Sequence, residues 1–247
     1  MAYEQFAYLY DYLMKDAPYE AWRDFVKRKI KQYGRTSSAR LLDVGCGTGE
    51  LSVRLAQDGF QVTGIDLSED MLTVAQAKAE ESGVRVEFFQ QNMTELEGFA
   101  LFDCVVIFCD SLNYLQNEAE VRQTFARIYE HLHDGGLFMF DVHSIYKMEH
   151  LFANQTFANN EEKISYIWNC FPGDVPYSVE HELTFFVQQS NGMYERFDEW
   201  HIQRTYEVER YQQWLLSTGF EVLDISADFT GEFPTETSER IFFVAKK

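Results

Sequence analysis

Short apolar runs that alternate with helix-like stretches fill residues 39–142, and they constrain the fold more than any other feature. The strand-like runs are ARLLDV, FQVTGID, VRVEFFQ, LFDCVVIFC and GLFMFDV. The fourth is almost continuously apolar, which is typical of a central parallel strand. Helical patterns occupy residues 50–59, 68–83 and 117–136. The alternation predicts a parallel sheet with right-handed crossovers and helices on both faces.

Helix-start signals support this assignment. Ser68 is the expected N-cap of the second helical stretch. Asn117 precedes the third, with Glu120 three positions later, in a near capping box.

The alternation of strand-like and helix-like segments stops after the fifth strand-like run. Residues 160–206 contain three strand-like segments and no helical pattern, with turn signals at Pro172-Gly173 and Asn191-Gly192. Asn-Gly favours a hairpin because both residues tolerate positive φ. These strands are therefore expected to be antiparallel and to form an insertion. A helix over VERYQQWLLSTG and two further strands, FEVLDIS and ERIFFVAKK, close the chain, and we expect the last two to pair antiparallel.

Composition limits the classes of function. The chain has 247 residues, 46% of them apolar, and a net charge of −19, which argues against a nucleic-acid partner. The one basic patch, KRKIKQYGR, is interpreted as a solvated helix face. We read no transmembrane segment, no secretory signal and no zinc-like Cys or His spacing, so no metal is expected. The four cysteines are interpreted as reduced, and the protein as cytoplasmic.

The loop GCGTGE at residues 45–50 places three glycines at alternate positions after the first strand. A dinucleotide fingerprint requires glycine at position 50, where Glu50 stands, and a P-loop requires a GK[ST] ending. Asp43 and Glu50 flank the loop and would repel phosphate. A cationic ligand without phosphate, such as S-adenosylmethionine, therefore suits the loop better.

Asp66 ends the second strand-like run, seventeen positions beyond Gly49. A carboxylate there can accept hydrogen bonds from both hydroxyls of an adenosine ribose. Enzymes that use NAD place an acid similarly, so Asp66 alone leaves both ligands open, and the loop favours S-adenosylmethionine.

Four ordered segments, LLDVGCGTGE, GIDLSEDML, FDCVVIFCDSLNYL and LHDGGLFMFDV, resemble the motifs of class I S-adenosylmethionine-dependent methyltransferases. The resemblance covers residues 36–145 and implies an α/β fold with a Rossmann-like, seven-stranded, mostly parallel sheet plus the antiparallel β insertion. It also implies that the loop backbone contacts the methionyl part of the cofactor and that Asp66 holds the ribose. The full set of cofactor-binding residues that it implies, with one N-terminal tyrosine, is Gly45, Cys46, Gly47, Gly49, Asp66, Leu67, Met71, Asn92, Met93, Cys109, Asp110 and Tyr8.

Within this set, Leu67 and Met71 are expected beside the adenine. Asn92 and Met93 stand where the family often has an Asp and an apolar residue, so Asn92 keeps an acceptor but loses a charge. Cys109 and Asp110 are expected to face the methionine moiety and the methyl group.

The layout is also similar to that of amino-sugar N-methyltransferases, in which a lid precedes the glycine loop and an antiparallel insertion follows the fifth strand. It implies an N-terminal helical lid at 1–35, a methyltransferase domain at 36–150 and 207–247, and a substrate cap at 151–206. The tyrosine-rich start makes Tyr3, Tyr8 and Tyr10 the candidates for the lid.

Substrate-facing residues should follow the fourth and fifth strands, because open parallel sheets bind ligands at the carboxyl ends of their strands. Tyr114 and His143 are the catalytic candidates, and His143 could serve as a base near neutral pH. Residues of the insertion that could line an acceptor pocket are Trp168, Glu180, Trp200, His201 and Arg204.

We therefore expect methyl transfer to a nitrogen or oxygen of a small molecule, by a monomer or homodimer with no membrane partner. The alternatives are a protein or RNA substrate, and a module that binds S-adenosylmethionine without catalysis.

Overall fold

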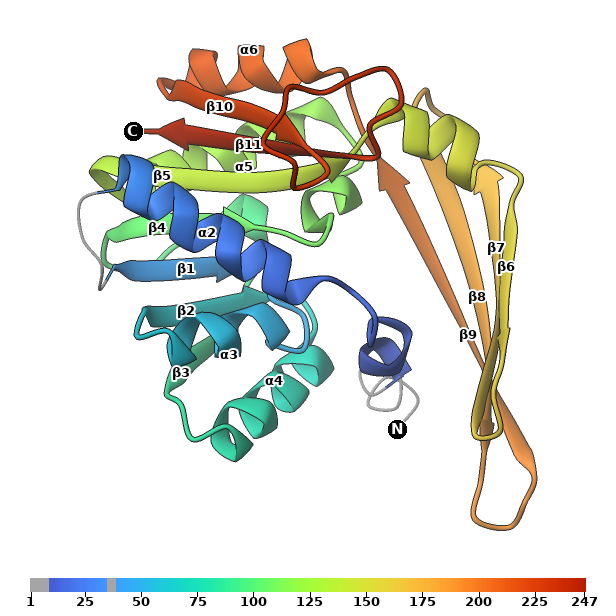
Figure 1. Cartoon of the computed structure of the whole chain (residues 1–247). Coiled ribbons are helices and arrows are strands. Elements are labelled where there is room, and N and C mark those ends of the chain that lie inside the picture. Colours follow the sequence, from blue (N-terminus) through green and yellow to red (C-terminus); the bar gives the residue numbers. More distant parts are fainter. Residues whose placement is uncertain (1–8, 35–38) are drawn as a thin grey trace.

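The computed structural model describes residues 9–34 and 39–247. Its main feature is a seven-stranded sheet with the strand order β10-β11-β5-β4-β1-β2-β3 (Figure 1). Strands β1 to β5 run parallel, whereas β11 pairs antiparallel with both β5 and β10. The predicted mostly parallel sheet and its antiparallel closing pair are confirmed. The strands are β1 (Arg40–Val44), β2 (Gln61–Asp66), β3 (Val86–Gln90), β4 (Phe102–Ile107), β5 (Leu132–His143), β10 (Glu221–Ala227) and β11 (Arg240–Lys246).

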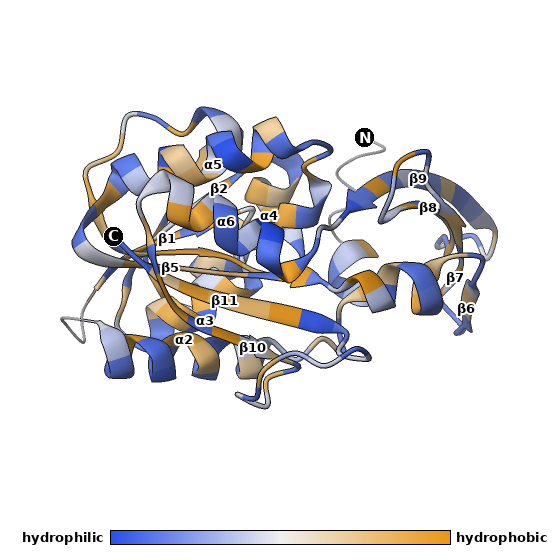
Figure 2. Ribbon diagram, turned by 90° about the horizontal axis from the view of Figure 1, so that it is seen from above, coloured by the Kyte–Doolittle hydropathy of each residue, from blue (hydrophilic) through white to orange (hydrophobic). Residues whose placement is uncertain are grey.

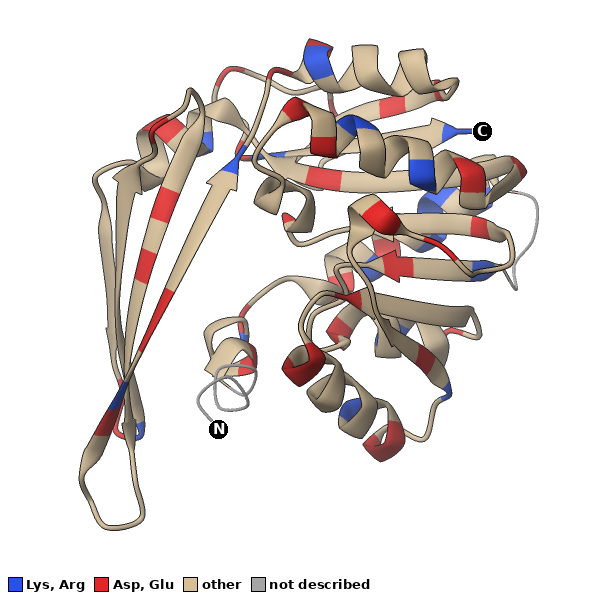
Figure 3. Ribbon diagram, turned by 180° about the vertical axis from the view of Figure 1, so that it is seen from behind, with Lys and Arg blue, Asp and Glu red and all other residues tan. Residues whose placement is uncertain are grey.

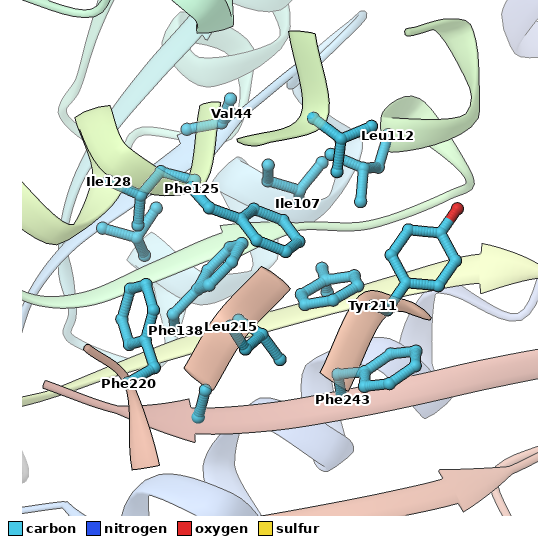
Figure 4. Packing of buried hydrophobic residues seen from close by; sticks show 14 of the residues in the cluster. Val44, Ile107, Leu112, Phe125, Ile128, Phe138, Tyr211, Leu215, Phe220 and Phe243 are labelled. Atoms are coloured by element: carbon cyan, nitrogen blue, oxygen red, sulfur yellow. The ribbon is translucent and has the colours of Figure 1, made fainter. Parts of the chain in front are cut away.

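Helices cover both faces of this sheet, as predicted. On one face α5 and α6 enclose an apolar cluster that includes Phe125, Phe138 and Phe243 (Figure 4). On the other face α2 and α3 pack through residues such as Trp22 and Leu55. Figure 2 shows the apolar colour concentrated along the sheet between the two helix layers. The helices are α2 (Tyr19–Tyr33), α3 (Glu50–Gln57), α4 (Glu69–Glu81), α5 (Glu118–His131) and α6 (Val208–Thr218).

The predicted caps form. The Ser68 hydroxyl accepts a hydrogen bond from the Met71 N–H, and the Asn117 side chain accepts one from the Glu120 N–H. Glu120 in turn accepts the Gln116 N–H, which completes a reciprocal capping arrangement.

One boundary differs from prediction. The helical pattern at 117–136 is too long, because α5 ends at His131 and β5 begins at Leu132. Gly135 has a φ of 81°, and the β4–β5 register shifts between Phe102 and Cys104, so an irregular strand segment replaces the expected last helical turn.

The insertion forms a separate four-stranded antiparallel sheet, which we call the second sheet, with the order β6-β7-β8-β9. Gly192, at a φ of 80°, turns the chain between β8 and β9, as its Asn-Gly signal predicts. Strand β6 was not predicted, because its residues TFANN carry no alternating apolar pattern and are mostly exposed. The strands are β6 (Thr156–Asn160), β7 (Ile164–Pro172), β8 (Ser178–Gln188) and β9 (Tyr194–Arg204).

The second sheet stands beside the edge at which the parallel strands end (Figure 1). It is anchored there by short turns that follow β4: the Asn113 amide donates to the Arg204 carbonyl at 2.8 Å, and the Gln116 amide donates to the Ile202 carbonyl at 2.8 Å. Leu9, in a helical segment at 9–13, packs with Leu183 and Phe185 of the second sheet. The short helical turns are η1 (Met93–Glu95), η2 (Ser111–Tyr114) and the π-helical η3 (Lys147–Phe152).

Acidic residues are distributed over both sheets and most helices (Figure 3). Among the residues that the structure describes, no helix is both long enough and apolar enough to cross a membrane.

Candidate active site

The glycine loop between β1 and α3 depends on glycine at specific points. Gly45 and Gly49 have φ values of 69° and 73°, which L side chains rarely adopt. A Cβ on Gly45 would stand 2.8 Å from the Ser111 Cβ, and one on Gly49 would stand 2.8 Å from the Ala75 Cβ. The loop therefore requires glycine both for its conformation and for its close packing.

Asp66 lies at the end of β2, as the sequence predicts. Its side chain holds the glycine loop in place. Its carboxylate accepts the Gly47 N–H at 2.8 Å and the Ser68 N–H at 2.9 Å. Burial raises the pKa of Asp66, although these backbone hydrogen bonds act in the opposite direction. One side chain thus joins the loop to the start of α4.

A pocket opens on the loop where β1 and β4 end. Four predicted site residues line it, namely Gly45, Cys46, Gly47 and Cys109. Among the other lining residues, Tyr10 was predicted to belong to a lid, and Asp43 and Glu50 were expected to repel phosphate and so to favour a cationic ligand. The other lining residues are Tyr10, Tyr19, Asp43, Thr48, Glu50, Leu51, Phe108 and Ser111.

Asp43 is the chemically most informative of these additional residues. It is 3% exposed, and its carboxylate accepts a hydrogen bond from the Ser52 hydroxyl at 2.5 Å. Burial raises the pKa of Asp43 to about 6, with the nearby Asp66 charge adding to the effect. The signal in the sequence is its carboxylate within the strand-like run ARLLDV, just before the glycine loop. A buried carboxylate of this kind suits a cationic ligand, because a cation would stabilise its ionised form.

The residues expected beside an adenine lie apart from that pocket. Leu67 is 67% exposed and Met71 is half-buried at the start of α4. The Asn92 side-chain oxygen accepts hydrogen bonds from both the N–H and the hydroxyl of Thr94, at 3.0 Å each. This oxygen, which was expected to be an acceptor for the adenine, therefore caps η1. Met93 packs against the core on the α5 side and near Gly45.

Asp110 faces the interior rather than the pocket. Its carboxylate accepts hydrogen bonds from Arg240 at 2.9 Å and Gln203 at 2.8 Å, and it lies 3.3 Å from Nε2 of His143. Burial opposes its ionisation, but His143 and Arg240 outweigh burial and lower the pKa of Asp110. Asp110 does not line the pocket, so its expected place facing the cofactor's methyl group stays a prediction.

His143 belongs to the same buried network. It is 4% exposed, and burial lowers its pKa despite the neighbouring Asp110 carboxylate. The Asn113 oxygen accepts its backbone N–H, and the Thr205 hydroxyl donates to its carbonyl. These contacts fix His143 in the interior and favour a structural role over that of a base that meets the substrate.

Tyr114 is 45% exposed at the end of η2, and its ring meets the His201 ring edge-on at 5.9 Å. Alternation along β9 then places Trp200, which is 54% exposed, on the opposite face from His201. Glu180 pairs with Ile202 and so lies on that opposite face too, whereas Trp168 shares the His201 face. The lid candidates Tyr3 and Tyr8 lie outside the described residues.

The N-terminal segment is held against the glycine loop by polar contacts. Lys78 of α4 forms ion pairs with Asp11 at 2.9 Å and with Glu50 at 2.7 Å. The Thr48 hydroxyl donates to Asp11 at 2.5 Å. Tyr10, one residue before Asp11, consequently forms part of the pocket wall.

Together, the strand order, the glycine loop after β1 and the acid that ends β2 define a Rossmann-like nucleoside-binding enzyme. The buried carboxylate beside the loop fits a cationic cofactor, and Glu50 stands where a dinucleotide fingerprint requires glycine, so the site favours the methyltransferase class over dehydrogenases.

Comparison with known proteins identifies the family. Residues 41–136 match a methyltransferase domain model. Over its whole length the chain is 66% identical to the whole of "Putative methyltransferase GWCH70_2453" of Geobacillus sp. (strain WCH70). It is 47% identical to "Putative methyltransferase YqeM" of Bacillus subtilis (strain 168), covering 100% of this chain and 98% of that protein. The chain belongs to the S-adenosylmethionine-dependent methyltransferases.

Solved structures agree with this assignment. An S-adenosylmethionine-dependent methyltransferase from Clostridium acetobutylicum ATCC 824 is 29% identical, with a TM-score of 0.89 over 100% of this chain and 99% of that chain. CalS10, an amino pentose methyltransferase from Micromonospora echinaspora, is 22% identical, with a TM-score of 0.75 over 97% of this chain and 95% of that one, which shows the shared fold. The predicted family, fold, enzyme class and S-adenosylmethionine cofactor are confirmed.

Proposed function

We propose that this methyltransferase transfers a methyl group to a nitrogen or oxygen of a small-molecule acceptor. The main observation behind this proposal is that the N-terminal segment helps to enclose the pocket. Tyr10 and Tyr19 form part of the pocket wall, and the segment that holds Tyr10 is packed against the second sheet through Leu9. A methyl group positioned in this pocket would be reached more easily by a small acceptor than by the backbone of a folded protein or a nucleic acid.

In this proposal the chain has three parts. Of residues 1–35, the part before α2 acts as a lid, while α2 itself packs on the main sheet. Residues 36–150 and 207–247 bind the cofactor, and residues 151–206 cap the acceptor. The N-terminal contacts to Thr48 and Lys78 support the first assignment, because they hold the segment over the glycine loop.

The residues in and around the glycine loop fit the proposed cofactor. S-adenosylmethionine supplies an activated methyl group on a cationic sulfur. The loop of Gly45, Gly47 and Gly49 would meet its methionyl part without side-chain interference, and Asp66 would hold the ribose. Asp43 would face positive charge, since it is a buried carboxylate on the pocket wall.

The protein's own contribution to the reaction is alignment and exclusion of water. Phe108 and Cys109, which directly follow β4, line the same pocket as the loop residues. Tyr114 is the residue we propose to contact the acceptor, because it is exposed directly after β4 and lies against His201 of the second sheet. A neutral amine acceptor would need only positioning, whereas a hydroxyl acceptor would need a base.

The names of similar proteins support a small acceptor. CalS10 is described as an amino pentose methyltransferase and KedS8 as a sugar N-methyltransferase, and both align with at least 97% of this chain. Proteins named ubiquinone biosynthesis O-methyltransferase match about half of it. The net charge of −19 further disfavours RNA, since phosphate binding draws its affinity from basic residues.

Release of S-adenosylhomocysteine in the presence of amino sugars, phenols, peptides and RNA tests the proposal. Turnover with a small amine or phenol, reduced in Tyr114→Ala, is the expected result. Turnover with peptide or RNA alone would refute the small-molecule assignment. Cofactor binding without turnover on any of them would favour the non-catalytic alternative.

A further inference from the structure

The turn after β4 is strained and lies beside the pocket. Cys109 and Asp110 have φ values of 54° and 56°, so two consecutive residues other than glycine adopt the left-handed conformation. Cys109 lines the pocket, and the Ser111 hydroxyl donates to the Gly45 carbonyl at 3.1 Å. The position of this turn therefore sets the shape of the pocket next to the glycine loop.

Strain of this kind persists only where surrounding contacts enforce it. The Asp110 N–H donates to Asp141 of β5 at 2.9 Å, while Arg240 of β11 bridges Asp110 and Asp141. Both partners belong to the main sheet. A further contact comes from the second sheet, where the Gln203 amide of β9 donates to the other Asp110 oxygen at 2.8 Å.

Gln203 is itself fixed by its neighbours. Its side-chain oxygen lies 3.2 Å from Nε2 of His181, and Nδ1 of His181 accepts the Trp168 indole N–H at 3.1 Å. With Nε2 of His181 protonated, every donor has an acceptor from Trp168 through His181 and Gln203 to Asp110. Gln203 is 5% exposed and His181 is 3% exposed, so water competes little for these bonds.

We propose that Gln203 is a positioning residue for methyl transfer. Acting through Asp110, it holds the Cys109–Asp110 turn against the pocket and so couples the second sheet to the cofactor. The inference rests on the proposed placement of the cofactor at the glycine loop. Gln203 does not line that pocket, so an effect of Gln203 on cofactor affinity is indirect, and its hydrogen bond to Asp110 provides a route through the turn.

Calorimetric binding of S-adenosylhomocysteine to Gln203→Leu tests the coupling. The variant keeps the size of the side chain but removes the donor, so the turn leaves its strained conformation for part of the time. If that conformation falls to about one tenth of the population, the dissociation constant rises about tenfold. Gln188→Leu, an identical change at an exposed position of β8, is the control and should bind as the wild type does. Unchanged affinity in a folded Gln203→Leu overturns the inference.

Gln203→Glu provides a second test, the pH dependence of cofactor affinity, which would not change if Gln203 had only a structural role. At pH 8 the introduced carboxylate repels Asp110, whereas its protonated form can donate to Asp110 and accept from His181. The ratio of variant to wild-type dissociation constant should therefore decrease from pH 8 to pH 6, and a constant ratio overturns the inference. The ratio removes pH effects that the variant and the wild type share. The charged or titratable groups around this position include Asp110, Tyr114, His143, His181, His201 and Arg240.

Asp66→Ala separates this inference from the proposed function. If Asp66→Ala loses affinity and Gln203→Leu does not, the coupling is wrong and the cofactor placement stands. If Asp66→Ala binds as the wild type does, the placement is wrong and the inference falls with it. Loss of affinity in both variants, together with wild-type affinity in Gln188→Leu, supports both proposals.

Discussion

Asp43→Asn should stabilise the protein and weaken cofactor binding. The pKa of Asp43 is about 6 in the folded chain, against an ordinary value of 3.8. Between these pH values the folded state binds a proton that the unfolded chain has released. Stability therefore decreases as the pH rises from about 4 to about 6, and it stays lower above that range.

The size of this penalty follows from the two pKa values. Their separation corresponds to about 3 kcal/mol at neutral pH, and Asn carries no charge at any pH. An Asn side-chain oxygen can still accept the hydrogen bond that the Ser52 hydroxyl donates to Asp43. We expect Asp43→Asn to gain at most about 3 kcal/mol at pH 8, or about 6–12 °C in melting temperature, and almost nothing at pH 4.

Thermal unfolding at pH 4 and pH 8 measures the gain, with Asp174→Asn as the control, because Asp174 is exposed. In parallel, S-adenosylmethionine affinity should decrease in Asp43→Asn, and its binding to the wild type near pH 5.5 should release a proton. A stability difference that is the same at both pH values, or a loss of stability at pH 8, would refute the reasoning.

Three further predictions concern the surrounding structure. In Gly49→Ala the new Cβ would stand 2.8 Å from the Ala75 Cβ, so the free energy of unfolding in urea should decrease by about 2–4 kcal/mol. In Gly83→Ala the new Cβ meets open space, so the decrease should be about 1 kcal/mol. Equal decreases in the two variants would contradict this prediction. Burial lowers the pKa of His181 to about 4, so protonation of His181 should cost about 3 kcal/mol of unfolding free energy as the pH falls from 7 to 4. His181→Gln lacks this cost, so the difference in stability between the wild type and His181→Gln in urea unfolding should change by about this amount between pH 7 and pH 4. Lys78→Met removes ion pairs that hold the N-terminal segment, so trypsin should cleave after Lys15 faster than in the wild type. These ion pairs are partly exposed, so the free energy of global unfolding should change by less than about 1 kcal/mol. An unchanged cleavage rate would show that the ion pairs do not hold the segment.

The sequence by itself determined the features that depend on neighbouring residues. Periodicity identified the strands and helices of the main sheet, because side-chain burial repeats every two residues in a strand and every 3.6 in a helix. Ser68 and Asn117 marked helix starts, since a capping bond joins residues three apart. The glycine loop and Asp66 indicated the cofactor, because the bend and the acid each follow the end of a strand. Where the local signal was absent, as in β6, prediction failed.

Tertiary structure alone decided which distant side chains meet. Asp110 contacts Gln203 across 93 positions and Arg240 across 130, and these contacts engage its carboxylate outside the lining of the pocket. Asp43 owes its raised pKa to burial beneath surrounding elements, a property that no local pattern encodes. The physical reason is common to both cases: hydrogen bonding and desolvation depend on distances in space. Those distances follow from strand order and register once the whole chain has folded.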